Sequence, residues 1–90
     1  MSDARLPARL TTAEAASVLQ ELRSALAAEP GDAVTLDAGG LRSFDSAAVA
    51  LLLELQRELR RTGRTLRVTQ WPPRLRDLVT AYGVQELLPA

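Results

Sequence analysis

The chain has 90 residues, with eleven basic and eleven acidic side chains and no formal net charge. A chain of this length forms one domain with a small core, and its balanced charge gives no reason to expect a nucleic acid partner. Cysteine is absent, which excludes disulfides and fits a reducing compartment. No apolar run approaches the about 20 residues that span a bilayer. We therefore expect a single cytoplasmic domain over residues 1–90, without direct membrane insertion.

The first third of the chain predicts a strand, a helix and a turn. Residues 6–10 alternate in the manner of a half-buried strand, and the proline among them favours a sheet edge because it donates no ladder hydrogen bond. Thr11 and Glu14 have the spacing of a capping box. Apolar residues then recur at helical spacing as far as Ala28, and residues 29–32 have the composition of a turn.

The remainder of the chain predicts two further strands, each followed by a helix. The strands are expected over residues 33–38 and 65–70, and the helices over 44–62 and from Pro72 to Gly83. Asp45 is the expected N-cap of the central helix, because its carboxylate can accept a free amide of the first turn.

This alternation of strands and helices predicts an α/β fold with a parallel or mostly parallel sheet. Sheets that are buried on both faces usually contain continuous apolar strands, whereas these strands alternate. We therefore expect the helices to pack on one face of the sheet and the other face to remain partly open.

The central helix divides into two unlike halves. From Leu52 onward one apolar stripe is flanked by polar side chains, Gln56 among them, as in a surface helix. Residues 47–53 are apolar without a break, so this part has nonpolar side chains on every side of its axis. The side that the core does not cover predicts a docking patch. Burial of the helix on two sides explains the same pattern, and periodicity alone does not separate the two.

The residue inventory excludes several chemistries. Because histidine and cysteine are absent, the chain has no imidazole base, no thiolate nucleophile and no thiolate zinc site. Asp37 and Asp45 are expected on one side of the sheet, where they can hold a cation or, alternatively, accept backbone amides. Gly39 and Gly40 precede a helix but lack a phosphate-loop motif, which predicts a plain turn. We expect no catalytic residue, no metal site and no cofactor.

Two single residues have open roles. Ser46, at the first turn of the central helix, is exposed by geometry, and a phosphate there would suit the positive end of the helix dipole. A serine chosen for local hydrogen bonding is the alternative. Trp71, the only tryptophan, can cover the end of the core or anchor a partner.

Residues 34–52 resemble the signature of STAS domains. The shared features are a strand that ends at Asp37, a loop, and a helix start with the sequence Phe-Asp-Ser-Ala-Ala at residues 44–48. The similarity continues through the strand at 66–68 and the closing segment 82–88. It implies a small, mostly parallel or mixed sheet with helices packed on one face.

Within that family the chain looks most like the small cytosolic subunit of a bacterial phospholipid-transport ABC complex. That subunit binds the ATPase and supports its assembly and activity without hydrolysing nucleotide. The resemblance implies an ABC ATPase partner within a membrane complex that includes a permease. The expected partner-binding residues are Asp45, Ser46, Ala47, Ala48, Val49, Leu51 and Tyr82.

Two other hypotheses remain open. Anti-sigma-factor antagonists of the same family are phosphorylated by a partner kinase on a hydroxyl that falls on Ser46. Ala48 stands where glycine is common, and its methyl group is an obstacle to close approach of such a kinase. A third hypothesis is a small nucleotide- or lipid-binding protein that uses the open sheet face. Under the leading hypothesis, a charge at Ala48 or Val49 abolishes docking and leaves the fold intact.

Overall fold

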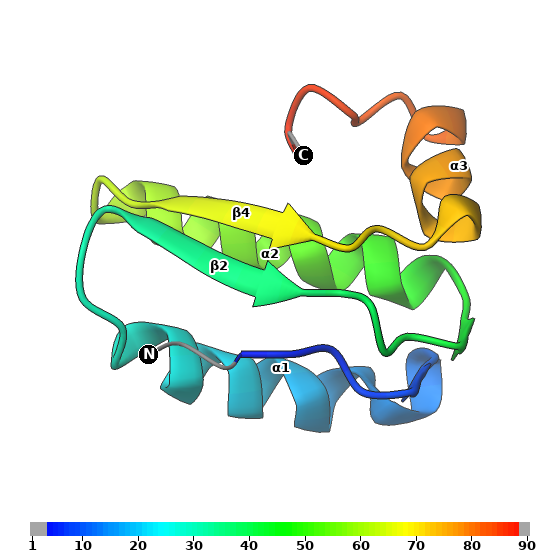
Figure 1. Cartoon of the computed structure of the whole chain (residues 1–90), viewed down its shortest axis with the longest axis horizontal. Helices are drawn as coiled ribbons and strands as arrows, with labels where there is room; N and C mark the ends of the chain where they lie inside the picture. The colour runs from blue at the N-terminus through cyan, green and yellow to red at the C-terminus, as the bar shows by residue number, and fades with distance from the viewer. Residues whose placement is uncertain (1–3, 89–90) are drawn as a thin grey trace.

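The computed structural model describes residues 4–88, in which the helices lie on one side of a parallel pair of strands. The strands are β2 (Ala33–Asp37) and β4 (Thr65–Thr69). In Figure 1, α2 (Ser46–Arg61) passes behind this pair, and α1 (Thr12–Ala27) lies below the pair, behind the N-terminal segment. Helix α3 (Pro73–Ala81) stands beyond the ends to which the strands point. The α/β class that the sequence predicts is confirmed.

The strand pair has one covered face and one open face. Val34 lies opposite Leu66 and Leu36 opposite Val68, and all four side chains are buried in the core. The side chains between them, such as Thr35 and Arg67, are exposed. The alternation of apolar and polar residues in these strands therefore corresponds to a sheet that has helices on one face only, as expected.

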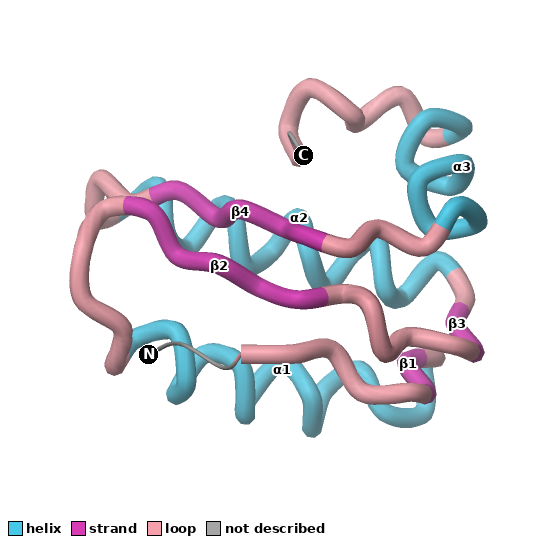
Figure 2. Tube along the Cα trace, viewed as in Figure 1, coloured by secondary structure: helices cyan, strands magenta, loops and turns pink. Residues whose placement is uncertain are grey.

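The N-terminal strand is divided into two short pieces. The Leu6 amide donates to the Asp37 carbonyl over 2.9 Å, which places this segment beside the end of β2. After the proline at position 7, β1 (Arg9–Leu10) pairs instead with β3 (Ser43–Phe44), in parallel, at the corner seen in Figure 2. The sequence did not predict β3, because a two-residue strand has no period to detect.

The ends of the helices follow local sequence signals. Thr11 caps α1, and Glu14 completes the capping box by accepting the Thr11 amide over 2.8 Å. Asp45 is the N-cap of α2, as predicted. Beyond the end of α2, Gly63 has a φ of +77°, in the region where a side chain is disfavoured, so glycine suits this helix stop.

The capping box makes the stability of the domain depend on pH. Hydrogen bonds from the Thr11 hydroxyl and amide lower the pKa of Glu14 from its ordinary value of 4.5 to about 2. Because the folded state holds the lower pKa, the stabilisation is complete above the ordinary value and is lost as pH falls from about 4.5 to about 2. We expect the difference in urea midpoint between the natural protein and Glu14→Gln to disappear over this window. A carboxyl signal of Glu14 that titrates near 4.5 by NMR would contradict this prediction.

Gln56 differs from its expected place on the polar side of α2, because its side chain is buried. Its Oε1 accepts the Leu66 amide over 2.8 Å, and its Nε2 donates to the Leu87 carbonyl over 3.1 Å. Gln56 therefore joins α2 to the outer edge of β4 and to the C-terminal segment. Helical periodicity places Gln56 outside the apolar stripe of α2. Its side chain is buried because backbone groups of β4 and of the C-terminal segment lie next to it.

Replacing Gln56 by leucine should destabilise the domain by about 1–3 kcal/mol, since the Leu66 amide then loses its acceptor in a buried position. The matched control is Gln20→Leu on the exposed side of α1, which should change stability by less than about 0.5 kcal/mol. Both free energies of unfolding can be measured by urea titration. Equal stability of the two variants would show that the hydrogen bonds of Gln56 contribute nothing.

Candidate partner-docking site

Asp45 connects the beginnings of the two long helices. Its Oδ1 accepts the Ala47 amide over 2.8 Å, and its Oδ2 accepts the Thr12 amide, in the first turn of α1, over 3.3 Å. Asp37 accepts the Gly39 amide over 2.7 Å, within its own loop. Both carboxylates thus serve as backbone acceptors. Within residues 4–88, no three acidic side chains come together as a metal site would require.

The start of α2 is more deeply buried than the sequence predicts. Ala48, Val49 and Leu51 are 0%, 3% and 4% exposed, respectively, so these three side chains do not form an exposed patch in the folded domain. The cause is that α2 contacts α1, α3 and β4, which together cover most of its circumference. Of the unbroken apolar run, Ala50 is exposed, and Ala47 and Leu53 are half-buried.

One groove lies between the start of α2 and α3. It encloses about 570 Å³ and brings together Asp45, Ser46 and Tyr82, three of the expected partner-binding residues. The Tyr82 side chain is 56% exposed. The Arg74 guanidinium lies 5.3 Å from the centroid of the Phe44 ring and gives this groove a mixed apolar and charged lining.

A second groove lies on the other side of α2, against α1. It encloses about 440 Å³. Its lining is mostly small and aliphatic, with Arg23 and Glu54 as its charged members; the apolar residues are Ala15, Ala16, Leu19, Ala47, Ala50 and Leu51. Sequence reasoning missed the contribution of α1, because nothing in the α1 pattern shows which residues border another helix.

The outward side of α2 between these grooves has only small, uncharged side chains. It consists of Ser46, Ala47 and Ala50, which we call the Ser46 ridge. Small side chains allow the backbone of a partner to approach closely, and the groove on either side can receive longer apolar side chains. This arrangement suits the docking of a protein.

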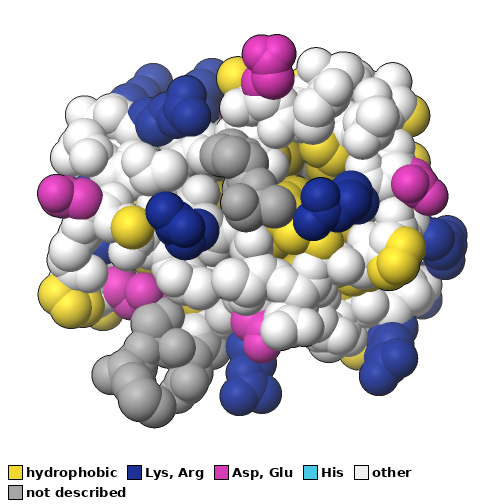
Figure 3. Space-filling view, turned by 45° about the horizontal axis from the view of Figure 1, so that its top comes forward, with side chains coloured by type: hydrophobic (Ala, Val, Ile, Leu, Met, Phe, Trp, Pro, Cys, Tyr) yellow, Lys and Arg dark blue, Asp and Glu magenta, His cyan; other side chains and the backbone are white. Residues whose placement is uncertain are grey.

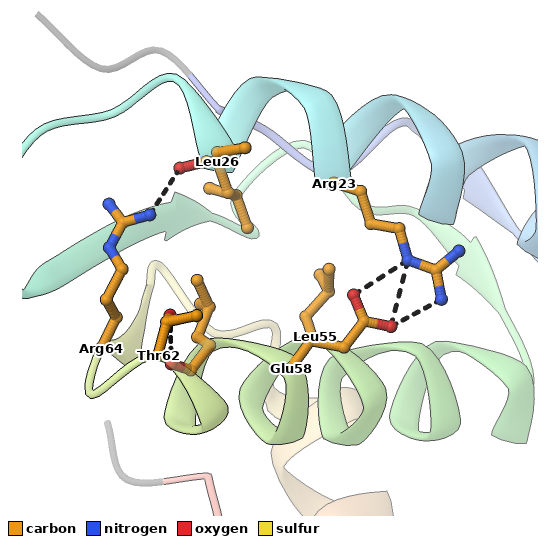
Figure 4. A pocket seen from close by; sticks show the side chains of 8 residues that line it. Arg23, Leu26, Leu55, Glu58, Thr62 and Arg64 are labelled. Carbon is orange, nitrogen blue, oxygen red and sulfur yellow. Dashed lines mark hydrogen bonds and ion pairs between the residues drawn. The ribbon is translucent and has the colours of Figure 1, made fainter.

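A third hollow, at the opposite ends of α1 and α2, has a different character. Figure 4 shows Arg23 reaching across it to Glu58, and Arg64 reaching to the end of α1. The Arg64 guanidinium donates to the carbonyls of Leu26, Glu29 and Gly31, and the Thr62 hydroxyl donates to the Leu59 carbonyl. Its charged and hydroxyl groups therefore have partners within the fold, which indicates a structural role.

The chain as a whole matches a known protein family. A family model described as Mlab, STAS domain, matches residues 4–89, nearly the whole chain. The chain belongs to the MlaB-like STAS domains. The small parallel sheet with helices on one face is consistent with the STAS fold, and STAS domains are in general non-catalytic binding domains.

A search of curated proteins gave no significant match to this STAS domain. None of the helices in the described part of the chain combines the length and apolarity that a bilayer crossing requires.

Because Val49 is buried and Ala50 is exposed, the same substitution at these two neighbouring positions should have different effects on stability. Val49→Asp should destabilise the STAS domain by several kcal/mol, because it places a charge in the core. Ala50→Asp places the same charge on the exposed Ser46 ridge and should cost less than about 1 kcal/mol. Urea unfolding followed by circular dichroism measures both. Similar midpoints for the two variants would show that Val49 is not interior.

Proposed function

We propose that this STAS domain is a non-catalytic subunit that docks on the ATPase of a bacterial Mla-type phospholipid-transport ABC complex. In this proposal it acts at the cytoplasmic side of the membrane and associates with the membrane only through the ATPase and the permease. The observation that carries the proposal is the exposed Ser46 ridge between two grooves, in a chain of the MlaB-like family.

The contact surface is revised from the one that the sequence suggests. Asp45, Ser46, Ala47 and Tyr82 remain in it, and Ala50 joins them. The buried Ala48 and Val49 support the ridge from below, since they hold α2 against its neighbours, whereas Leu51 also lines the groove against α1. Replacement of Ala48 or Val49 would affect docking through the fold and not through a lost contact.

The Ser46 ridge provides a sharp test of docking. Ala50→Arg should weaken capture of the Mla-type ATPase from the same genome by about 100-fold or more, because a long charged side chain would keep the partner off the ridge. Ala25→Arg is the matched control, on an exposed turn of α1 outside both grooves. Co-purification of the two subunits measures the effect. Undiminished capture by both Ala50→Arg and Ser46→Arg would refute the assignment of this surface.

A second candidate function is that of an anti-sigma-factor antagonist regulated by phosphorylation of Ser46. The observation that favours it is that Ser46 is exposed, whereas the methyl group of Ala48 is fully buried and so does not obstruct a kinase from outside. Intact-mass analysis of protein purified from its native host distinguishes the antagonist function from the ATPase-docking function. A phosphate-sized addition that Ser46→Ala removes would support the antagonist, and its absence in both growing and starved cells would count against it.

A further inference from the structure

The groove between α1 and α2 is bordered by small side chains on both helices. On α1 these are Ala15 and Ala16, and on α2 they are Ala47 and Ala50. Ala16 and Ala50 are exposed, and the larger Leu19 beside them is only half-buried. Ala47 and Ala50 also belong to the Ser46 ridge, so a partner that covers the ridge comes to lie over the edge of this groove. The groove is therefore continuous with the proposed docking surface.

The two charged side chains of this groove already have partners within the fold. The Arg23 Nε donates to the Glu58 carboxylate over 2.9 Å, and Glu54 forms an ion pair with Arg57. Removing a charge from water is costly unless it is paired. Because these charges are paired, an apolar group that enters the groove leaves neither of them without a partner. The lining therefore favours an uncharged, apolar occupant.

Two other hollows match an apolar occupant less well. The groove between α2 and α3 contains Arg74 and Asp77, and within residues 4–88 neither of them forms an ion pair. An apolar side chain in that groove would take water away from charges that nothing else compensates. The cavity between α3 and the C-terminal segment, on the side where Figure 3 shows apolar side chains in a hollow, encloses only about 260 Å³ and shares no residue with the Ser46 ridge.

The groove between α1 and α2 has the length of about two helical turns. The helices start side by side and run in the same direction, and the lining extends from Ala15 to Arg23 on α1 and from Ala47 to Glu54 on α2. At 1.5 Å per residue, each stretch is roughly 10–12 Å long. Side chains four residues apart on a helix project from the same side, about 6 Å from each other. Two such side chains match the length of this groove.

We propose that this groove receives a helix of the ATPase partner that presents two aliphatic side chains one turn apart. These side chains pack against Leu19 and Leu51, and the alanines along the rim let the two backbones approach closely. Amphipathic helices bind apolar grooves in this way, through residues at i and i+4. The inference rests on the proposed function and adds α1 to the contact surface, with Ala16 and Leu19 as residues that select the partner.

Ala16→Trp fills the groove from α1 and leaves the Ser46 ridge unchanged. We expect it to weaken binding of the Mla-type ATPase from the same genome by about tenfold or more, because the indole takes the space of the partner's side chains. Ala25→Trp, on an exposed turn of α1 outside both grooves, is the matched control and should bind normally. Both positions are exposed, so both variants are expected to fold, which circular dichroism verifies. Undiminished binding by Ala16→Trp, or equal weakening by both variants, would overturn the proposal.

Two substitutions at Leu19 test the chemistry of the occupant. Leu19→Met keeps the wall of the groove apolar at similar volume and should leave the affinity nearly unchanged. Leu19→Asn should weaken binding by about tenfold or more, because it sets an amide against aliphatic side chains that offer no hydrogen bond. Urea unfolding verifies that both variants are folded under the conditions of the binding measurement. Equal affinity of the two folded variants would refute an apolar occupant.

The same binding measurements distinguish failure of this inference from failure of the proposed function. If the natural protein captures the ATPase and Ala50→Arg does not, the proposed function stands, and the variants of Ala16 and Leu19 then decide whether the partner enters the groove. If the natural protein does not capture the ATPase at all, the proposed function is refuted and the assignment of the groove is refuted with it.

Discussion

Helix α2 contacts α1, α3 and β4 at once, and the positions of the other elements depend on this packing. Leu52 and Leu55, both almost fully buried, are central residues of its covered side. Packing on three sides requires a helix that is apolar over most of its circumference, and residues 47–53 have that composition. The apolar run therefore reflects burial first. What remains for a partner is the narrow strip of small residues that its neighbours leave uncovered.

Two polar side chains fix how α2 sits among these neighbours. Asp45 accepts amides at the start of both long helices, and Gln56 joins the middle of α2 to the edge of β4. Apolar contacts give most of the free energy of burial but tolerate sliding, whereas hydrogen bonds to particular backbone atoms do not. The Ser46 ridge follows directly after Asp45, so this carboxylate also determines where the candidate docking surface lies.

The polar groups of the domain differ in whether they have hydrogen-bond partners within the described residues. Arg23, Arg64 and Thr62 at the far ends of α1 and α2 all bond within the fold, and that hollow requires no ligand to complete it. Within residues 4–88, by contrast, the buried indole nitrogen of Trp71 has no hydrogen-bond partner. A buried donor is costly when unpaired, so the fold satisfies its polar groups at the ends of the long helices better than it does at Trp71.

The sequence by itself determined the local features of this domain. The capping box of Thr11 and Glu14, the Asp45 cap, the stop at Gly63, the three helices and the two longer strands each depend on a few consecutive residues, and all were predictable. The alternation in those strands also indicated the open sheet face. Together with the motif at residues 44–48, these features identified the STAS family.

Only the tertiary structure decided which sides of these elements are covered. Val49 and Leu51 are apolar whether they meet a partner or the core, and Gln56 is polar whether it meets water or a strand edge. The two-residue strand β3 exists because a remote segment pairs with it. Burial depends on contacts with residues that are distant in the sequence, and a local sequence pattern does not show which contacts those are.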